Sequence, residues 1–125
     1  MALKFSNHEI QLINIYIGLV LRHTRLSAKI SQHDISISCG IDSTAIGRIE
    51  RAEHMSNWSS IYLLSKFLNI EFSKLFILKE KDEFLDIINS SYKLETKLSN
   101  EKKRYYKNLV NKVNELFVEL NKSTN

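Results

Sequence analysis

The chain has 125 residues, of which 43% are hydrophobic and 26% charged, a composition typical of a globular domain. This length excludes large barrel enzymes and most two-domain cofactor enzymes. Eighteen basic and 14 acidic residues leave a net charge of +4, and cutting the chain after Leu78 leaves +2 on each part, as eight minus six and ten minus eight. Such a balance permits a local nucleic-acid-binding patch without arguing for one.

Residues that interrupt helices are scarce, since the chain has no proline and only three glycines. Tight strand hairpins have little to turn on, so we expect an all-α fold. The most apolar segment, residues 10–21, is too short to span a bilayer, and it does not resemble a signal peptide. A single cysteine, Cys39, excludes an internal disulfide framework and fits a cytoplasmic location.

The first predicted helix covers residues 7–27. Ser6 and Glu9 have the spacing of a capping box at its start. The early half of this helix is apolar on several faces and therefore needs cover on more than one side. We expect part of that cover to come from a dimer or partner interface that includes Ile10 and Ile13.

Two short helices are predicted next. Ser31 and Asp34 form a second capping box, Gly40 ends that helix, and Asp42 caps another over residues 43–51. This is the pattern of a helix-turn-helix. The apolar positions that can share one core are Ile35, Cys39, Ile41, Ile46 and Ile49. The positions predicted to face outward are Ser43, Thr44, Gly47, Arg48 and Arg51.

Two further helices complete the N-terminal part. Asn57 can cap a helix over residues 58–68, and a short helix follows near 72–78. Trp58 could stack on a base, but at the start of a helix it is more often a hydrophobic anchor, and we interpret it so.

The C-terminal part, residues 79–125, carries two apolar registers that break near Ser99-Asn100. One long helix with a change of register and a helical hairpin both explain that break. Packing on the body of the protein and a coiled coil between chains remain alternatives. We assign a dimer or partner interface to an apolar stripe without an obvious intrachain partner, namely Leu109, Val113, Leu116 and Leu120.

The N-terminal part gives, in order, Gly18-x-x-Leu21-Arg22-x-x-Arg25, Ile30-Ser31-Gln32, Ile35, Gly40-Ile41-Asp42, Ile46 and Ile49-Glu50-Arg51. This combination resembles the phage-repressor and Cro-like helix-turn-helix family, the XRE family. It implies a five-helix DNA-binding domain over residues 1–78. Residues 79–125 then form a dimerisation or partner-binding segment.

The resemblance also implies roles for individual residues. The second helix of the motif enters the major groove, so base reading is expected from Ser43, Thr44, Gly47 and Arg48. Phosphate contacts are expected from Gln32, Lys29, Arg51 and Asn57. The family pairs the residues that match Arg25 and Glu50, and we expect this structural ion pair to lie at least partly exposed.

Some positions depart from the family pattern. Lys29 and Ala52 stand where the family usually has glycine, Ser56 replaces a usual loop proline, and Ser36 replaces a small alanine. Lys29 and Ala52 fit if their turns avoid positive φ. The departures therefore concern loop geometry more than the fold.

No residues suggest catalysis. Four scattered histidines and Cys39 lack metal-ligand spacing, and no glycine-rich phosphate loop is present. We therefore expect no enzyme activity, metal or cofactor. The leading hypothesis is a cytoplasmic transcription regulator that reads a roughly palindromic double-stranded DNA site as a homodimer. The alternative is a protein-interaction module, antitoxin-like or phage-type, whose C-terminal helices bind a protein partner.

Overall fold

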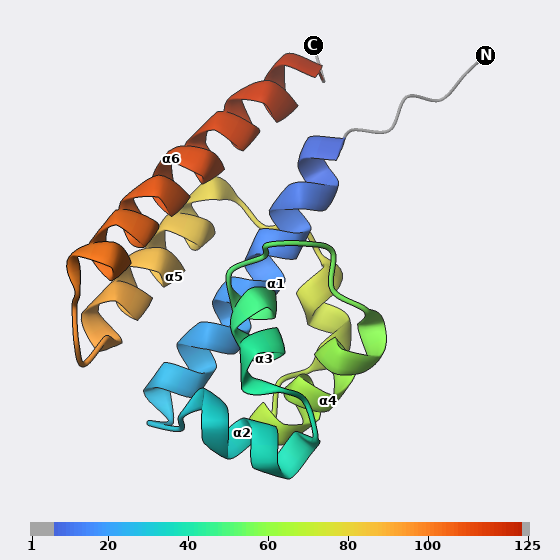
Figure 1. The fold of residues 1–125 in the computed structure, drawn as a ribbon. Coiled ribbons are helices and arrows are strands. Elements are labelled where there is room, and N and C mark those ends of the chain that lie inside the picture. The colour runs from blue at the N-terminus through green and yellow to red at the C-terminus, as the bar shows by residue number, and fades with distance from the viewer. Residues whose placement is uncertain (1–6, 124–125) are drawn as a thin grey trace.

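The computed structural model describes residues 7–123, and within this range the fold is all-α, as predicted (Figure 1). Ser6, the predicted cap of the first helix, lies outside the described residues. One short 3-10 helix, η1, accompanies the α-helices. The elements are α1 (Asn7–Ser27), α2 (Gln32–Cys39), α3 (Ser43–Glu50), α4 (Trp58–Leu68), η1 (Phe72–Phe76), α5 (Lys81–Leu94) and α6 (Asn100–Ser123).

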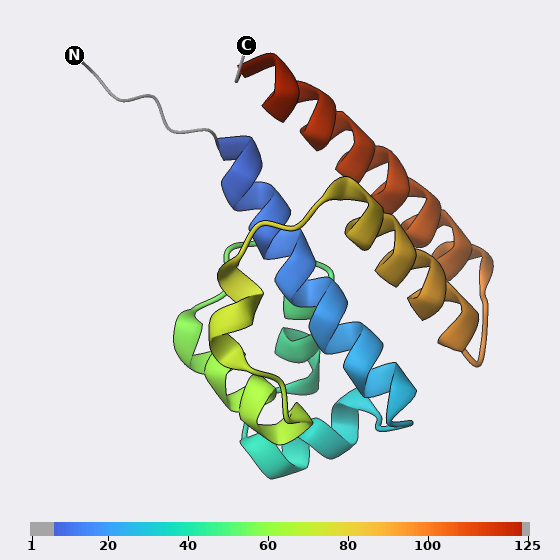
Figure 2. The ribbon, with the colours of Figure 1, turned by 180° about the vertical axis from the view of Figure 1, so that it is seen from behind.

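Helix α1 is the central element, with the four short elements on one side and the α5–α6 pair on the other (Figures 1 and 2). Two separate apolar clusters meet it. One is built around Ile17, Leu21, Ile35, Ile46, Ile49, Ile61, Leu64 and Leu75. The other is built around Leu12, Ile15, Leu19, Phe84, Ile88, Tyr106, Val113 and Leu116. The chain itself therefore covers both sides of this unusually apolar helix.

The C-terminal part is a hairpin of α5 and α6, so the break predicted at Ser99-Asn100 separates two helices (Figure 2). Val113 is 0% exposed and Leu116 is 4% exposed in the cluster shared with α1 and α5. Leu109 and Leu120 are partly buried against the same cluster. The stripe has an intrachain partner after all, and Val113 and Leu116 offer no surface to a second molecule.

Two of the predicted helix caps are confirmed. Ser31 and Asp34 form the full capping box of α2, and the Asn57 side chain accepts a backbone hydrogen bond at the start of α4. Asp42 precedes α3 as predicted, but its side chain makes no capping hydrogen bond. The boundaries of α2, α3 and α4 therefore follow from local sequence with one cap fewer than expected.

Two turns contradict the expected backbone geometry. Lys29 has a φ of 58° and Ala52 a φ of 52°, so both are left-handed where a negative φ was expected. Each follows a helix and closes it with paired backbone hydrogen bonds, such as Ile30 N to Arg25 O at 3.2 Å. This is the helix ending for which glycine is usually chosen. Both non-glycine residues therefore carry left-handed backbone strain.

Candidate nucleic-acid interface

The outer face of α3 carries the polar residues predicted to read bases. Thr44 and Arg48 are exposed one helical turn apart, whereas Ser43 is half-buried. Ile46 and Ile49 on the opposite face are buried in the cluster that also contains Ile17 and Leu21 of α1. The exposed face of α3 therefore carries a short polar stripe, Thr44 and Arg48, while its opposite face is packed in the core.

Arg48 is available for a ligand. Its Nε lies 3.8 Å from a carboxylate oxygen of Glu53, and both side chains are about half exposed. An exposed ion pair at this distance contributes little and exchanges readily for another partner. The guanidinium can therefore reach a base or a phosphate without breaking a buried contact.

Gly47 does not belong to the exposed surface, contrary to the prediction. It is buried, and a Cβ added there would lie 3.0 Å from Nη1 of Arg51 and 3.5 Å from Nε2 of Gln32. The missing side chain leaves room for these two polar groups to lie across α3. Gly47 is thus a positioning residue for Arg51 and Gln32.

The ion pair between Arg25 and Glu50 joins α1 to the end of α3. Arg25 donates from Nε and Nη2 to the two carboxylate oxygens, at 2.7 and 3.1 Å, and from Nη1 to the carbonyl of Ile30. The two side chains are only 10% and 2% exposed. The expectation of partial exposure is therefore wrong, and the pair is an internal, two-pronged contact.

Gln32 belongs to the same network. Its Nε2 donates to Oε1 of Glu50 at 2.9 Å, which holds the first residue of α2 against α3. Among the other predicted phosphate contacts, Lys29, Arg51 and Asn57 are exposed. Asn57 Oδ1 accepts from the backbone nitrogen of Ser60, so its side chain is also engaged as the cap of α4.

Gly18 explains how closely α1 approaches α3. A Cβ at this position would lie 2.5 Å from the carbonyl oxygen of Glu50 and 2.7 Å from that of Ile49. Neither backbone oxygen can move without shifting α3. The position of the polar stripe therefore depends on this glycine as well as on the buried ion pair.

Sequence reasoning missed a second buried arginine on α1. Arg22 Nη2 donates to Oε2 of Glu95 at 2.7 Å, and the Tyr106 hydroxyl donates to the same oxygen at 2.7 Å. The guanidinium lies 5.1 and 5.3 Å from the ring centres of Tyr105 and Tyr106. The available signal was the position of Arg22 one turn before Arg25.

The charges in this second network are shifted from their ordinary behaviour. Burial tends to raise the pKa of Glu95, but hydrogen bonds from Tyr106 and Arg22, with the charges of Arg22 and Lys102, hold that pKa below its usual value. Burial and the bond to Glu95 raise the pKa of the Tyr106 hydroxyl. Both groups therefore keep the protonation states that the hydrogen bond needs.

An aromatic face lies on α4, η1, the start of α1 and the α3–α4 loop, and we define it by Trp58, Tyr62, Phe72, Phe76, Met55 and Ile10. Trp58 is 69% exposed, so its interpretation as a buried anchor is wrong. The Tyr62, Phe72 and Phe76 rings follow one another at 5.5 and 5.0 Å. Phe76, Met55 and Ile10 line an apolar hollow of about 180 Å³ together with the half-buried Ile13.

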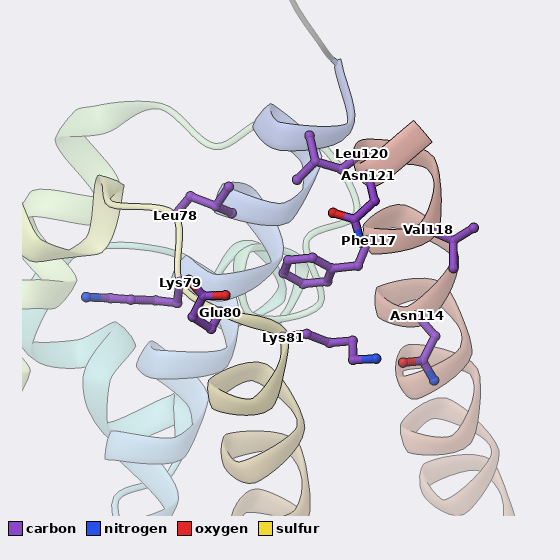
Figure 3. Close-up of a pocket in the computed structure, with 9 residues that line it drawn as sticks. All are labelled: Leu78, Lys79, Glu80, Lys81, Asn114, Phe117, Val118, Leu120 and Asn121. Atoms are coloured by element: carbon purple, nitrogen blue, oxygen red, sulfur yellow. The ribbon is translucent and has the colours of Figure 1, made fainter. Parts of the chain in front are cut away.

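Another hollow, of about 630 Å³, lies where the segment before α5 faces the end of α6 (Figure 3). Lys79 and Lys81 point in different directions there, and Phe117 projects from α6 toward α5. Its polar lining consists of Lys79, Glu80, Lys81, Asn114 and Asn121. Among residues 7–123 no group of three metal-ligating side chains occurs.

In comparisons with known proteins, no family model, curated protein or solved structure matches this chain. The resemblance to the XRE family therefore stays a prediction from the sequence. In the part of the chain that the structure describes, no helix has the length and apolarity to cross a bilayer.

Proposed function

We propose that this protein is a transcription regulator that binds double-stranded DNA in a sequence-specific manner through α3. The observation that carries the proposal is the exposed pair Thr44 and Arg48 on a helix whose inner side is held by the buried Arg25–Glu50–Gln32 network. The left-handed turns at the positions where the resembling family has glycine also support it.

In this function α3 lies in the major groove with its N-terminal turn against the base edges. Arg48 donates two hydrogen bonds to a guanine, and the hydroxyl of Thr44 bonds a neighbouring base edge. Lys29, Arg51 and the N-terminus of α4 bind flanking phosphates, which set the register of the protein on the duplex. The buried network contributes by keeping α2 and α3 in one fixed relation.

Selection from a randomised duplex pool at about physiological salt tests the proposal, with Arg48→Ala selected in parallel. The wild type should enrich a defined sequence, and Arg48→Ala should lose about 1–3 kcal/mol of binding and its preference at one base pair. Lys122→Ala, at the far end of α6, is the matched control and should keep the motif. Enrichment that ignores the Arg48 change would contradict base reading by α3.

We also propose that a second copy binds through the aromatic face. Ile10, Met55, Trp58, Tyr62 and Phe76 are between 39% and 69% exposed. At about 200 Å² per large side chain, they present on the order of 500 Å² of apolar area. A standard interface buries about 800 Å² per partner, of which about 65% is apolar in homodimers. The exposed area therefore matches what one isologous dimer contact requires.

Sedimentation and the selected DNA motif test this dimer. Tyr62→Glu places a charge in the aromatic face and should yield a monomer with a single half-site. Val118→Glu changes a half-exposed residue on α6 and should leave the dimer and a two-fold motif intact. A wild-type monomer at high micromolar concentration would remove the dimer.

The alternative function, a protein-interaction module, is favoured by the same aromatic face rather than by the C-terminal stripe. A large exposed apolar patch is typical of protein-binding sites. In that case Arg48→Ala leaves partner binding unchanged, whereas Tyr62→Glu abolishes it. The two variants together therefore separate a DNA reader from a pure protein binder.

A further inference from the structure

The positive charge of the chain is concentrated on the first half of α6. Between Glu101 and Glu115 the sequence has five basic residues and no acidic one, a local charge of +5. The whole chain carries +4, so all other residues together amount to −1. The five residues are Lys102, Lys103, Arg104, Lys107 and Lys112.

Four of these residues divide between two flanks of the helix. Lys102 lines a hollow of about 660 Å³ together with Gln32 and Arg51, and Lys112 lines another with residues 52–55 of the α3–α4 loop. Lys103 and Lys107 instead border the hollow between α5 and α6. One flank therefore faces the start of α2, the end of α3 and the α3–α4 loop, and the other faces α5.

Two of the three carboxylates near the first flank, Glu53 and Glu95, are already engaged. Glu53 lies in both hollows, and its carboxylate accepts from Arg51 Nε at 3.1 Å. Glu95 is bonded to Arg22. Lys102 lies 3.6 Å from Glu95, yet its side chain is 40% exposed and that carboxylate has a closer arginine. Glu101 also borders the larger hollow.

The spacing of Lys102 and Lys112 suits a nucleic-acid backbone. Ten residues of helix separate them, which is about 15 Å along the axis. Each DNA strand presents a phosphate for about every 3.4 Å of duplex axis, so the two lysines span about four phosphates. Arg51 of the α3 side lies next to the Lys102 end of this line.

We propose that the flank of α6 with Lys102 and Lys112 is a second DNA-backbone contact, beside the groove that α3 enters. It rests on the proposed function and assigns the C-terminal hairpin to the DNA-binding surface. The two lysines neutralise phosphates and read no bases, so they contribute affinity at every sequence and leave the preferred sequence unchanged.

The test is the salt dependence of binding to labelled duplexes of about 30 base pairs, three turns of DNA. One duplex carries the sequence that the wild type enriches and the other a random sequence. For the double variant Lys102→Gln/Lys112→Gln, the slope of log affinity against log salt should fall by about 1.8, since each phosphate contact contributes about 0.9. If the two proteins bind equally at 1 M salt, this slope change means that the variant binds both duplexes about 60-fold more weakly at 0.1 M salt.

The matched control is Lys103→Gln/Lys107→Gln, which removes the same charge from the same helix on the flank that faces α5. The slope for this control should differ from the wild-type slope by less than about 0.45, which is half the contribution of one phosphate contact. Equal effects of the two double variants would overturn the proposal and leave only a net-charge effect. An unchanged slope in Lys102→Gln/Lys112→Gln would overturn it as well.

Two further measurements separate the possible failures. Lys112→Gln alone leaves the ion pair of Lys102 intact and should show half of the slope change, so a folding defect at Lys102 cannot imitate the result. A wild type that enriches no sequence refutes the proposed function. If it still binds DNA and the two double variants differ as expected, the α6 contact stands without base reading. A wild type that binds no DNA refutes both.

Discussion

The two sides of α1 are held by different kinds of contact. On the α2–α3 side, Arg25 makes three hydrogen bonds, two to Glu50 and one to a backbone carbonyl. On the hairpin side, Arg22 makes one ion pair with Glu95, its Nε has no hydrogen-bond partner, and two tyrosine rings stack on it. Hydrogen bonds are directional, whereas ring and apolar packing tolerate small shifts. The hairpin side also has the 2.8 Å contact of His23 Nε2 with Ser90 Oγ, which joins α1 to α5. Because three hydrogen bonds hold Arg25 and one holds Arg22, we expect the α3 surface to be positioned more strictly than the hairpin.

Removing the acceptor on each side should give the largest difference. Glu50→Ala leaves Arg25 buried without its charge partner and should cost about 3–5 kcal/mol of unfolding free energy. Glu95→Ala should cost less, about 2–3 kcal/mol, because the Arg22 guanidinium keeps its contact with the tyrosine rings. Urea unfolding of both variants measures the two values.

Glu53→Ala is the control for these substitutions, since it removes an exposed carboxylate and should change stability by less than about 1 kcal/mol. Equal losses for Glu50→Ala and Glu95→Ala would show that the hairpin is fastened as strictly as α3. A larger loss for Glu95→Ala would reverse the comparison.

The loss of unfolding free energy at low pH should depend on Glu95, on the hairpin side of α1. The lowered pKa of Glu95 means that its contribution is complete above the unfolded-state value, about 4.3, and is lost as pH falls below it. Tyr106→Phe removes one of the hydrogen bonds that lower this pKa, so the variant should lose less stability on acidification. The difference in unfolding free energy between the wild type and Tyr106→Phe should therefore become smaller from pH 7 to pH 3.

Tyr92→Phe is the control for the pH experiment, because the Tyr92 ring packs 5.5 Å from that of Tyr106 and its hydroxyl is not bonded to Glu95. It should follow the wild-type pH profile. A gap between wild type and Tyr106→Phe that is constant with pH would mean that the hydroxyl contributes through packing alone.

Helix boundaries could be predicted from local sequence because caps act within one turn. Ser31 with Asp34, and Asn57, placed the starts of α2 and α4 correctly. Periodicity also identified the core positions Ile35, Ile46 and Ile49. In the candidate site, Thr44 and Arg48 lie on the exposed face as expected. Their contact with DNA stays a prediction.

Properties that depend on distant packing could not be predicted in this way. The stripe with Val113 matched an interface and an intrachain core equally well, since both bury apolar residues at the same spacing. Trp58 has the same apolar character in a core and on a surface. Gly47 lies at the right helical angle for the groove, but Arg51 folds over it. The basic run of α6 is not visible in the net charge of residues 79–125, because acidic residues elsewhere in that part offset it.

The smallest expected effect concerns the left-handed turns, which differ in whether the hairpin touches them. Lys29 is exposed, whereas Ala52 packs against the cluster on the hairpin side. Substitution by glycine relieves left-handed strain, which stabilises the folded protein by about 1–2 kcal/mol. It also increases the conformational entropy of the unfolded chain, which destabilises the folded protein by about 0.4–1 kcal/mol. Lys29→Gly should therefore stabilise the protein by about 0.5–1 kcal/mol. Ala52→Gly should be close to neutral, because it also loses about 0.8 kcal/mol of methyl burial. Thermal unfolding of both variants distinguishes these outcomes, and a clear gain at Ala52 would show that the hairpin makes no productive contact with the α3–α4 loop.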